Sequence, residues 1–487
     1  MKKLVLLMIS SIFVLSDSFA QNEFDVLRYS TVEHYGDARF SAMGGSFGAL
    51  GANLSALSTN PGGLGVYKSS DFSFTPSFHY NYSESNKDGN NVTDGKLNFH
   101  FSNVGIAGNF AGDGDWKAVN IAIGYNRLNN YNTSIAIKSS TNNSYLNTYA
   151  NELNANGGTF EDDIPGEFPF SSNLAYQTYL VNPIFTDSLK YDHVFKDSKN
   201  ISQLTNYETR GGAGEMYFAV GTNYSDKLYL GASLGIPTVR YVYDRNYTET
   251  SDPSDTLTAF KSFTVHDYVR TSGAGVNLKL GAIYKVADWF RIGTAFHTPT
   301  VYSLSDQWST TVSSENKTGE VLTETSPSGN FEYMITTPYR FISSAAFIVG
   351  RYGVVNADYE IVDYATARIN EDAEFGTADF SVENQSIRNN FRSTHNIRVG
   401  TEWRLDPFRL RAGYRYQGDP LKNNFNIDNS ASIYSVGFGV KQEEYYFDMA
   451  YSQKQHKAES AIDANQNDFA SVSLTDHYIS FTLGFRF

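Results

Sequence analysis

Apolar and polar residues alternate along most of this chain, in segments separated by turns and loops. In the last eleven residues, from His477 to Phe487, the odd positions are mostly apolar and the even positions mostly polar. Because successive side chains of a β-strand point to opposite faces, this pattern predicts a strand with one apolar and one polar face. The same alternation occurs at residues 119–125, 228–236, 276–284, 290–296, 396–405, 409–416 and 445–451. The chain is therefore predicted to be all-β.

Arginines indicate which face of these strands points away from lipid. Five of them share the polar face of two consecutive predicted strands: Arg398, Arg404, Arg409, Arg411 and Arg415. On the lipid face of a membrane barrel an arginine costs roughly 2–4 kcal/mol at the bilayer centre, so we expect these five to point into a lumen. There they can attract a ligand carboxylate, although such groups more often pair with acidic neighbours, here Glu402, Asp358 and Glu360.

The connections between strands distinguish a membrane barrel from a soluble β-sandwich. Short turns at 111–115, 225–227, 286–288, 351–353, 406–407 and 443–444 alternate with long loops such as 137–212, 370–390 and 455–472. Tight turns at one rim and long loops at the other are typical of outer-membrane barrels. Between the connections we count about fourteen strands, an even number that allows an antiparallel transmembrane barrel to close without exposed strand edges.

Two positions interrupt the alternation. Phe99 and Phe101 occupy odd positions of their face, whereas Val104 and Ile106 occupy even ones. A change of parity within a strand indicates either a β-bulge or a strand break, here near residues 102–103. Pro338 predicts a second interruption, because proline cannot donate a hydrogen bond to a neighbouring strand.

Composition and charge narrow the class of protein. The chain has 487 residues, a net charge of -14 at pH 7 and 0 cysteines. The acidic balance argues against nucleic-acid binding, and the absence of cysteine excludes disulfides and thiolate metal sites. Residues 1–20 combine a basic start, an apolar run and Ser18-Phe19-Ala20, the pattern of a secretory signal peptide, so export is expected. No later stretch approaches the roughly 20 apolar residues of a spanning helix.

The stretch 39–67 breaks the strand pattern. It belongs to a predicted N-terminal domain of residues 21–70, followed by the barrel domain of residues 71–487. Four apolar residues at helical spacing predict a short helix: Phe47, Leu50, Leu54 and Leu57. Glycines 44, 45, 48 and 51 allow close backbone contacts, and Asn60-Pro61-Gly62-Gly63 predicts a tight turn. We expect this domain to plug the lumen as a hatch.

The long loop 137–212 is rich in apolar groups. Residues 168–170, 174–176, 179–181 and 184–185 are mostly apolar in a segment that should otherwise face solvent. A loop of this length in a compact protein usually has a function. The two interpretations are a self-packed cap on the barrel and a surface site that accepts an apolar ligand.

The hatch sequence resembles that of a known family. Residues 41–47 (Ser-Ala-Met-Gly-Gly-Ser-Phe), Ser55-Ala56 and residues 60–64 (Asn-Pro-Gly-Gly-Leu) are similar to the N-terminal hatch of the outer-membrane long-chain fatty-acid transporter family (FadL/TodX type, OMPP1). The usual turn in that family is Asn-Pro-Ala-Gly-Leu, so Gly62 replaces an alanine. The resemblance implies a barrel of about 14 strands closed by its hatch, and uptake of hydrophobic molecules. It also implies their sideways release into the membrane, through a gap beside a kinked early strand.

The expected function is therefore uptake of hydrophobic molecules, above all long-chain fatty acids, across the outer membrane of a Gram-negative bacterium. The alternatives are a barrel for surface display or adhesion that transports nothing, an outer-membrane hydrolase or acyltransferase, an open diffusion pore, and uptake of other apolar ligands such as aromatic hydrocarbons or haem. The hatch residues expected to bind ligand or gate the channel are Met43, Gly44, Gly45, Phe47, Leu50, Leu54, Leu57, Asn60, Pro61, Gly62, Gly63 and Leu64.

No enzyme activity, cofactor or metal is expected. The 9 histidines are scattered, and none forms a His-x-x-x-His pair that would place two ligands on one helix face. The expected partners are outer-membrane lipid and a hydrophobic small molecule such as a fatty acid, with no nucleic acid. We expect a monomer.

Overall fold

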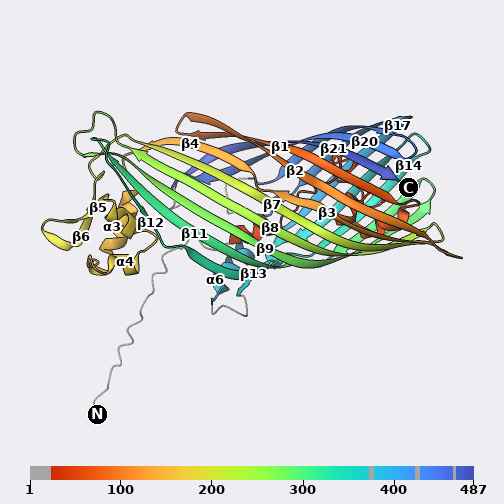
Figure 1. Ribbon diagram of the computed structural model, residues 1–487, viewed down its shortest axis with the longest axis horizontal. Coiled ribbons are helices and arrows are strands. Elements are labelled where there is room, and N and C mark those ends of the chain that lie inside the picture. The colour runs from red at the N-terminus through yellow and green to blue at the C-terminus, as the bar shows by residue number, and fades with distance from the viewer. Residues whose placement is uncertain (1–22, 372–377, 423–427, 464–467) are drawn as a thin grey trace, which may run out of the picture.

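An elongated antiparallel barrel makes up most of the molecule (Figure 1). The computed structural model describes residues 23–371, 378–422, 428–463 and 468–487, so the predicted signal peptide 1–20 lies outside the described residues. The barrel closes because β1 (Asp71–Lys87) pairs with β2 (Asn90–Ala111) on one side and with β21 (Phe469–Arg486) on the other. Over the described residues the wall has fourteen strand positions, as predicted.

Several wall positions are made of two strands that follow each other in the sequence. β3 continues into β4, β10 into β11, β13 into β14 and β15 into β16. The interruption between β13 and β14 lies at residues 337–339, as Pro338 predicts. The other strands that belong to this sheet are β3 (Trp116–Asn130), β4 (Thr133–Thr141), β7 (Ile201–Tyr224), β8 (Leu228–Thr250), β9 (Phe260–Ala287), β10 (Phe290–His297), β11 (Val301–Asn316), β12 (Val321–Thr325), β13 (Gly329–Thr336), β14 (Arg340–Val349), β15 (Gly353–Asp363), β16 (Arg368–Glu371), β17 (Ser393–Leu405), β18 (Phe408–Gln417), β19 (Ala431–Lys441) and β20 (Tyr445–Ala461).

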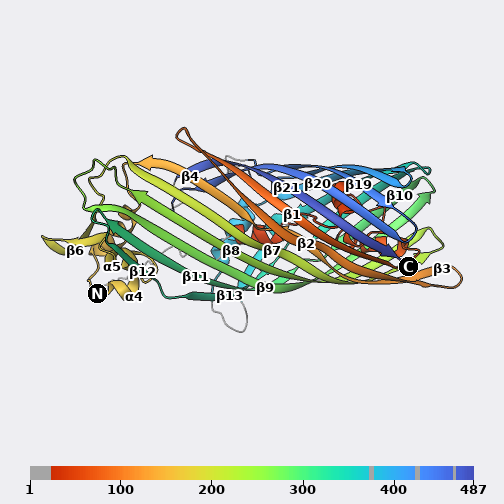
Figure 2. The ribbon, with the colours of Figure 1, turned by 45° about the horizontal axis from the view of Figure 1, so that its top comes forward.

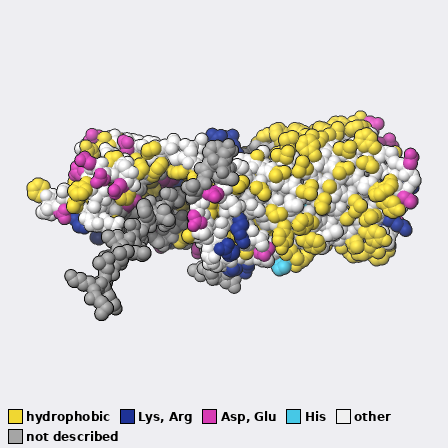
Figure 3. Space-filling view, turned by 90° about the horizontal axis from the view of Figure 1, so that it is seen from below, with side chains coloured by type: hydrophobic (Ala, Val, Ile, Leu, Met, Phe, Trp, Pro, Cys, Tyr) yellow, Lys and Arg dark blue, Asp and Glu magenta, His cyan; other side chains and the backbone are white. Residues whose placement is uncertain are grey.

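The two faces of the wall follow the predicted alternation. On β21, Leu483 and Phe485 are exposed on the outside, whereas Ser480 and Thr482 are buried on the inside. Arg398 is 1% exposed and points into the lumen. The outward apolar side chains form a continuous band toward the short-turn end of the barrel (Figure 3). The polar face is therefore inside, as the arginine pattern predicts.

The hatch lies inside the barrel at its short-turn end. It contains α1 (Glu23–Ser30), α2 (Ala38–Ala42) and two 3-10 helices, η1 (Ser55–Ser58) and η2 (Pro61–Val66), before β1 begins at Asp71. Residues 37–50 are buried, apart from the partly buried Arg39. None of the helices among the described residues is long and apolar enough to cross a membrane.

The predicted helix through Phe47 and Leu57 is wrong. Residues 47–54 form turns and irregular backbone, because Gly51 and Ala52 have φ angles of 67° and 52°, in the left-handed region that interrupts a right-handed helix. The apolar positions still face inward, but in two separate clusters. Their regular spacing thus reflects burial rather than one helix.

A cap of residues 142–200 covers the long-loop end of the barrel (Figure 2). The long strands β7, β8, β9 and β11 extend to this end. It consists of α3 (Leu146–Asn154), η3 (Ala155–Gly157), α4 (Ile164–Glu167), α5 (Ser172–Gln177) and the hairpin of β5 (Val181–Ile184) and β6 (Asp187–His193). The predicted loop bounds 137–212 are wrong, because residues 137–141 belong to β4 and residues 201–212 to β7. The wall strands continue far beyond the apolar band.

The cap has its own apolar core, shared with the barrel. Leu153, Leu174 and Leu180 are fully buried, and they belong to one cluster with Tyr247 of β8 and Phe263 of β9. Such a cluster is the signature of a packed unit. The structure thus favours the self-packed cap over the surface ligand site. Two further elements lie between wall strands, η4 (Tyr364–Thr366) and α6 (Ser381–Asn390).

Candidate functional site

The turn at Asn60 attaches the hatch to one side of the barrel. The Asn60 side chain accepts a hydrogen bond from Gly62 N at 2.9 Å and donates to Gly48 O at 2.6 Å and to Ala282 O at 3.1 Å. A single amide can make these bonds because it carries both an acceptor and two donors. It therefore closes its own turn, ties the turn to the rest of the hatch and fixes both to β9.

Glycines of the wall allow this turn to lie directly on the strands. Gly221, Gly231 and Gly281 are cross-strand neighbours on β7, β8 and β9. A Cβ atom at any of them would collide with residues 60–65 of the hatch. Glycine inside a strand often marks such a close approach of another backbone. The three glycines thus form a docking surface for the Asn60 turn.

A second glycine pair holds the hatch on another part of the wall. Gly400 of β17 and Gly413 of β18 are also cross-strand neighbours. A Cβ atom at either would collide with the backbone of Met43 or Gly44, at the end of α2. The hatch is therefore held between two docking surfaces, each formed by glycines at neighbouring positions on adjacent strands.

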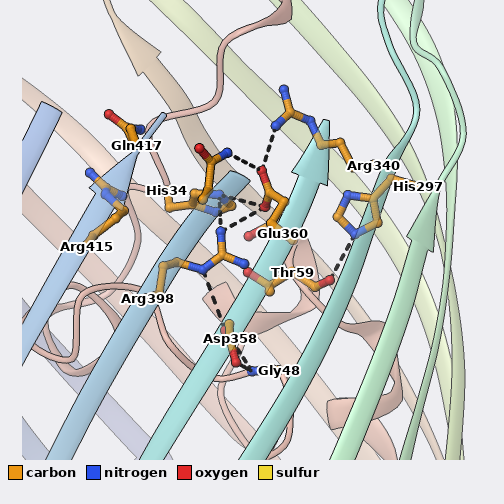
Figure 4. Close-up of polar contacts among 12 residues, drawn as sticks. His34, Gly48, Thr59, His297, Arg340, Asp358, Glu360, Arg398, Arg415 and Gln417 are labelled. Atoms are coloured by element: carbon orange, nitrogen blue, oxygen red, sulfur yellow. Dashed lines mark hydrogen bonds and ion pairs between the residues drawn. The ribbon is translucent and has the colours of Figure 1, made fainter. Parts of the chain in front are cut away.

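Asp358 of β15 fixes the middle of the hatch. Its carboxylate accepts a hydrogen bond from Gly48 N at 3.1 Å (Figure 4) and another from Phe47 N at 3.0 Å. Asn356 donates to Ser46 Oγ at 2.7 Å. These backbone N–H groups are buried, and a buried donor without a partner costs about 1–3 kcal/mol. Asp358 therefore stabilises the hatch where its backbone is irregular.

Glu360 is the centre of a buried charge network between hatch and wall (Figure 4). Arg340 Nη1 lies 2.9 Å and Arg398 Nη1 lies 2.8 Å from the Glu360 carboxylate, and Arg398 Nη1 also lies 2.7 Å from His34 Nε2. Arg340 in addition donates a hydrogen bond to Ser30 O. The predicted pairing of Arg398 with Glu360 is thus confirmed, and the pair also holds the hatch.

A second ion-pair group holds Glu33 of the hatch. Lys454 Nζ lies 2.6 Å from Glu33 Oε1, and Arg415 donates to the Glu33 carbonyl. Burial alone would raise the pKa of Glu33, but the charges of Lys454 and Arg415 lower it to about 2. Burial, together with the neighbouring Arg398 charge, lowers the pKa of His34 to about 4. Near neutral pH, Glu33 is charged and His34 is neutral.

Closer to the short-turn end, the hatch is held through Arg39. The Arg39 guanidinium lies 2.7 Å from Glu402, which also pairs with Arg411 at 2.8 Å. Arg411 pairs in turn with Asp448 of β20 at 2.6 Å. The predicted acidic partner Glu402 therefore bridges a hatch arginine and a wall arginine.

The other two arginines of the predicted set lie near the rim. Arg404 is 3.8 Å from Glu402, with its side chain 41% exposed, and Arg409 pairs with Asp406 in the turn at 2.5 Å. They point to the short-turn end of the lumen rather than to its middle. Arg398, Arg411 and Arg415 are the buried members of the set.

The predicted ligand-binding residues of the hatch are divided between two apolar clusters. Phe47 and Leu50 belong to one, and Leu54, Leu57 and Leu64 belong to another. Both clusters include wall residues, so these side chains pack the hatch against the barrel. Whether they also contact a ligand stays a prediction.

The wall has a gap in its hydrogen-bond ladder between β2 and β3. The ladder ends at the pair of Asn103 and Asn126, and in the described chain residues 90–102 of β2 pair only with β1. Ser102 is an extra residue in the β1–β2 register, which confirms the predicted bulge. Phe99 and Phe101 beside it are exposed on the outer, apolar face.

Hatch residues cover this gap from inside. Glu33 N donates to Leu128 O of β3 at 2.8 Å, and the Tyr35 ring lies 6.1 Å from that of His100 and 4.9 Å from that of Tyr478. Asn103 Nδ2 donates to Asn126 Oδ1 at 2.8 Å across the ladder end. Sequence reasoning missed Tyr35 and His100, although the parity change at residues 102–103 indicated the place.

An aromatic group at the α1 end of the hatch was also missed. The rings of Tyr29, Tyr131 and Tyr241 lie 5.6–6.5 Å apart in edge-to-face arrangements, and the Arg28 guanidinium lies 4.3 Å above the Tyr241 ring. These tyrosines come from α1, the end of β3 and β8. No local pattern in the sequence connects them, because only barrel closure brings them together.

Two segments have the Gly-x-Ser-x-Gly spacing of a hydrolase nucleophile, at residues 44–48 and 231–235. Neither lies on a strand-to-helix turn: Ser46 is buried and bonded to Asn356, and Ser233 lies within β8. Among the described residues, no group of three or more His, Cys, Asp or Glu side chains is arranged to hold a metal ion.

Comparison with known proteins gives one family-model match and several similar solved structures. The family model described as outer membrane protein transport protein (OMPP1/FadL/TodX) matches residues 216–483. A Pseudomonas aeruginosa FadL homologue has a similar structure, with a TM-score of 0.56 and 11% identity over 94% of this chain and 99% of the other. The P. putida toluene transporter TodX gives 0.53 and 13% over 94% and 99%. The Ralstonia pickettii toluene transporter TbuX gives 0.50 and 14% over the same shares. No curated protein matches the chain.

Proposed function

Because the chain belongs to the family of outer membrane transport proteins described as OMPP1/FadL/TodX, we propose that it takes up hydrophobic small molecules through its barrel. Long-chain fatty acids are the first candidate substrates. The protein acts as a monomer in the outer membrane of a Gram-negative bacterium, with the short-turn end toward the periplasm. The hatch gates the passage, and the ligand leaves sideways into the membrane.

The construction of the hatch carries this proposal. It fills the lumen, yet it is held by hydrogen bonds, ion pairs and contacts with glycines rather than by covalent links. Burial of an acyl chain contributes about 0.8 kcal/mol per methylene, so a long chain entering the lumen has enough binding energy to displace several such contacts.

The gap beside β2 supports sideways release. Polar side chains and Tyr35 fill it, and the outer surface next to it carries Phe99 and Phe101. A strand edge without a partner can separate without breaking a backbone ladder. Withdrawal of the segment 31–35 would therefore connect the lumen with the hydrocarbon of the bilayer.

Aromatic hydrocarbons are the second candidate substrates. The cluster of Tyr29, Tyr131 and Tyr241 offers ring faces and edges to an apolar ring, and two relatives of similar fold are described as toluene transporters. In addition, the buried arginines Arg398, Arg411 and Arg415 already have carboxylate partners in the closed hatch. A fatty-acid carboxylate would have to replace one of these partners, whereas toluene would not.

A reducible disulfide between hatch and wall tests whether the hatch must move during uptake. A Cβ atom at Gly48 of the hatch would lie 2.8 Å from Ser344 Cβ of β14, so Gly48→Cys with Ser344→Cys places two thiols within disulfide range after a small adjustment. The chain has 0 other cysteines to interfere. Uptake of radiolabelled palmitate and of toluene is measured in cells, under oxidising conditions and after reduction.

We expect the oxidised double variant to lose uptake of the true substrate, reduction to restore it, and each single cysteine variant to stay active. The substrate that responds identifies the ligand class. Full uptake through the oxidised variant would contradict hatch gating.

A further inference from the structure

A cavity of about 320 Å³ lies beneath the hatch at the short-turn end of the barrel. We call it the lower cavity. Arg39 and Asp37 of the hatch contribute to it, and the wall contributes residues near the short turns, such as Arg404, Arg409 and Lys441. It therefore lies on the opposite side of the hatch from the aromatic cluster, and the gap beside β2 is not part of it.

Basic groups outnumber acidic groups around the lower cavity. Its basic residues are Arg39, Arg291, Arg404, Arg409, Arg411, Lys441 and Arg486, and its acidic residues are Asp37, Asp71, Glu402 and Asp448. The whole chain has a net charge of -14, so the excess of basic groups in this cavity is opposite in sign to the charge of the protein. Concentrated positive charge in a concave, partly enclosed site attracts anions more strongly than the same charge on an open surface.

Most of these cations have a carboxylate partner. Arg39 and Arg411 share Glu402, Arg486 lies 3.9 Å from Asp71, and Arg409 pairs with Asp406 outside the cavity. Two cations are different: among the described residues, neither Arg291 nor Lys441 has a carboxylate within ion-pair distance.

Arg291 and Lys441 are nevertheless placed as anion ligands. Arg291 donates to Leu50 O at 3.2 Å, and its buried Nε has no hydrogen-bond partner in the part of the chain that the structure describes. Lys441 is surrounded by the like charges of Arg39, Arg409 and Arg486. Uncompensated cations in a partly buried site favour a bound anion, because it supplies the missing charge and hydrogen-bond acceptors.

Part of the remaining lining is apolar. Leu50, Leu54 and Val66 of the hatch and Ile348 and Val354 of the wall share the cavity with the charged groups. Its volume lies at the lower end of the range for small-molecule sites. An inorganic anion would leave this apolar surface uncovered, whereas an anion with an apolar body would cover it.

We propose that the lower cavity is a binding site for a small amphipathic anion, a carboxylate or phosphate ester with an apolar body, which enters from the short-turn end. Lys441 binds the anionic group, Arg291 adds uncompensated positive charge to the same cavity, and the apolar residues of hatch and wall contact the body. The site is distinct from the passage of the transported molecule and does not depend on the identity of that molecule.

Binding of soluble probes to the full-length protein in a non-ionic detergent tests the site. The probes are phenyl phosphate and phenylacetate, with inorganic phosphate as the head group alone and phenol as the neutral body. Isothermal titration calorimetry gives affinity and stoichiometry. We expect one site for phenyl phosphate or phenylacetate, binding about tenfold or more tightly than inorganic phosphate, and no detectable phenol binding.

Lys441→Gln is the main variant, because Lys441 lies near the rim and makes none of the hatch contacts described above. It should weaken probe binding about tenfold, and Lys441→Arg should restore it. Lys227→Gln, an exposed lysine in the turn before β8, is the matched control and should change nothing. Arg291→Gln should act like Lys441→Gln, with its folded state checked by protease resistance.

Equal affinity in Lys441→Gln and the unchanged chain would overturn the site. Equal affinity for inorganic phosphate and phenyl phosphate would overturn its amphipathic character. Palmitate and toluene uptake, measured on the same variants, reports separately on the proposed function, since loss of probe binding with normal uptake leaves that function intact.

Discussion

At the scale of single residues, Gly62 shows how closely the hatch fits its barrel. The resemblance described above implies an alanine at this place in the turn, yet a Cβ atom at Gly62 would lie 2.9 Å from the backbone of Ala282. Real Cβ atoms do not approach backbone so closely, so something must shift. In this chain the turn lies directly on the backbone of β9, and glycine is the residue that permits it.

We therefore expect Gly62→Ala to loosen the hatch. Overpacking of this kind typically costs about 1–3 kcal/mol, and the strain here falls on two backbones rather than on a flexible side chain. Limited proteolysis of the hatch in detergent should become faster. Gly166→Ala, where nothing lies within 4 Å of the added Cβ, is the matched control; equal protease resistance of the two variants would contradict the fit described here.

The lowered pKa of His34 predicts that the hatch is less stable in acid. Its Nε2 accepts a hydrogen bond from Arg398, and Glu360 and Arg415 are the other charged groups near it. Because its pKa falls from 6.5 in the unfolded chain to about 4, the unfolded state binds the proton more readily. The stabilisation is complete above about pH 6.5 and is lost as the pH falls toward 4.

Hatch protection, measured by hydrogen exchange between pH 7 and pH 4, should fall over this window. In His34→Gln, which keeps an acceptor but cannot take up the proton, the decrease should be smaller. Glu33 contributes separately and only at lower pH, since its pKa falls from 4.5 to about 2 and its stabilisation is lost below about pH 4.5. An identical decrease in the variant would assign the acid sensitivity to other groups.

At the scale of elements, the connection between hatch and wall is concentrated at the edge of β3. The segment 31–35 bonds to Leu128 where the β3–β7 register is irregular, and its Tyr35 packs on His100 and Tyr478. The same few residues therefore hold the hatch closed and cover the gap beside β2. One movement can open both.

Tyr35→Ala should open the covered gap more often. Each aromatic contact is worth about 0.5–1.5 kcal/mol, so the loss of two weakens the closed state by about 1–3 kcal/mol and raises the open population about fivefold or more. Release of a fluorescent fatty acid from loaded protein into lipid vesicles measures this. Tyr179→Ala, an exposed tyrosine of the cap, is the control, and an unchanged rate in Tyr35→Ala would show that the ligand leaves elsewhere.

At the scale of the whole molecule, the barrel and the hatch stabilise each other. Several charged groups that face the lumen, among them Arg398, Arg415 and Lys454, have partners in the hatch. Removing the hatch would leave these charges in an open tube, where water replaces the lost partners. The barrel wall itself does not need the hatch, because its ladder closes through β1 and β21.

Deletion of residues 22–59 should consequently convert the closed barrel into a conducting pore. Single-channel conductance in planar bilayers should rise from near zero to stable open levels, while heat-modifiable mobility in gels shows that the barrel remains folded. The full-length protein in the same bilayers is the control. Unchanged conductance would mean that the hatch does not close the lumen.

Much of this fold was predictable because β-barrels repeat one rule along the chain. The alternation placed the apolar side of β21 outward and the arginines of β17 and β18 inward, and the parity change at residues 102–103 marked a real bulge. Local interactions decide each of these features. The predicted helix through Phe47 was wrong, because buried side chains can recur at helical spacing without forming a helix. The predicted bounds of loop 137–212 were wrong, because the strands extend beyond the membrane.

The candidate site was predictable only in part. The hatch sequence pointed to the segment that lies inside the barrel, and the acids expected to pair with the arginines do so at Glu360 and Glu402. Glu33, Tyr35 and His100 were not predicted. Their partners are distant in the sequence, and no local spacing records such pairings.

By itself, the sequence determined the strand faces, the approximate strand number, the asymmetry of turns and loops, and the special character of residues 39–67. These features follow from the periodicity and size of the residues, which can be recognised within each short segment without knowledge of its partners. Only the tertiary structure decided which glycines receive the hatch, which carboxylate each arginine binds, and where the wall lacks a ladder. Glu33 meets Lys454 across 421 residues, and such a contact exists only once the barrel has closed.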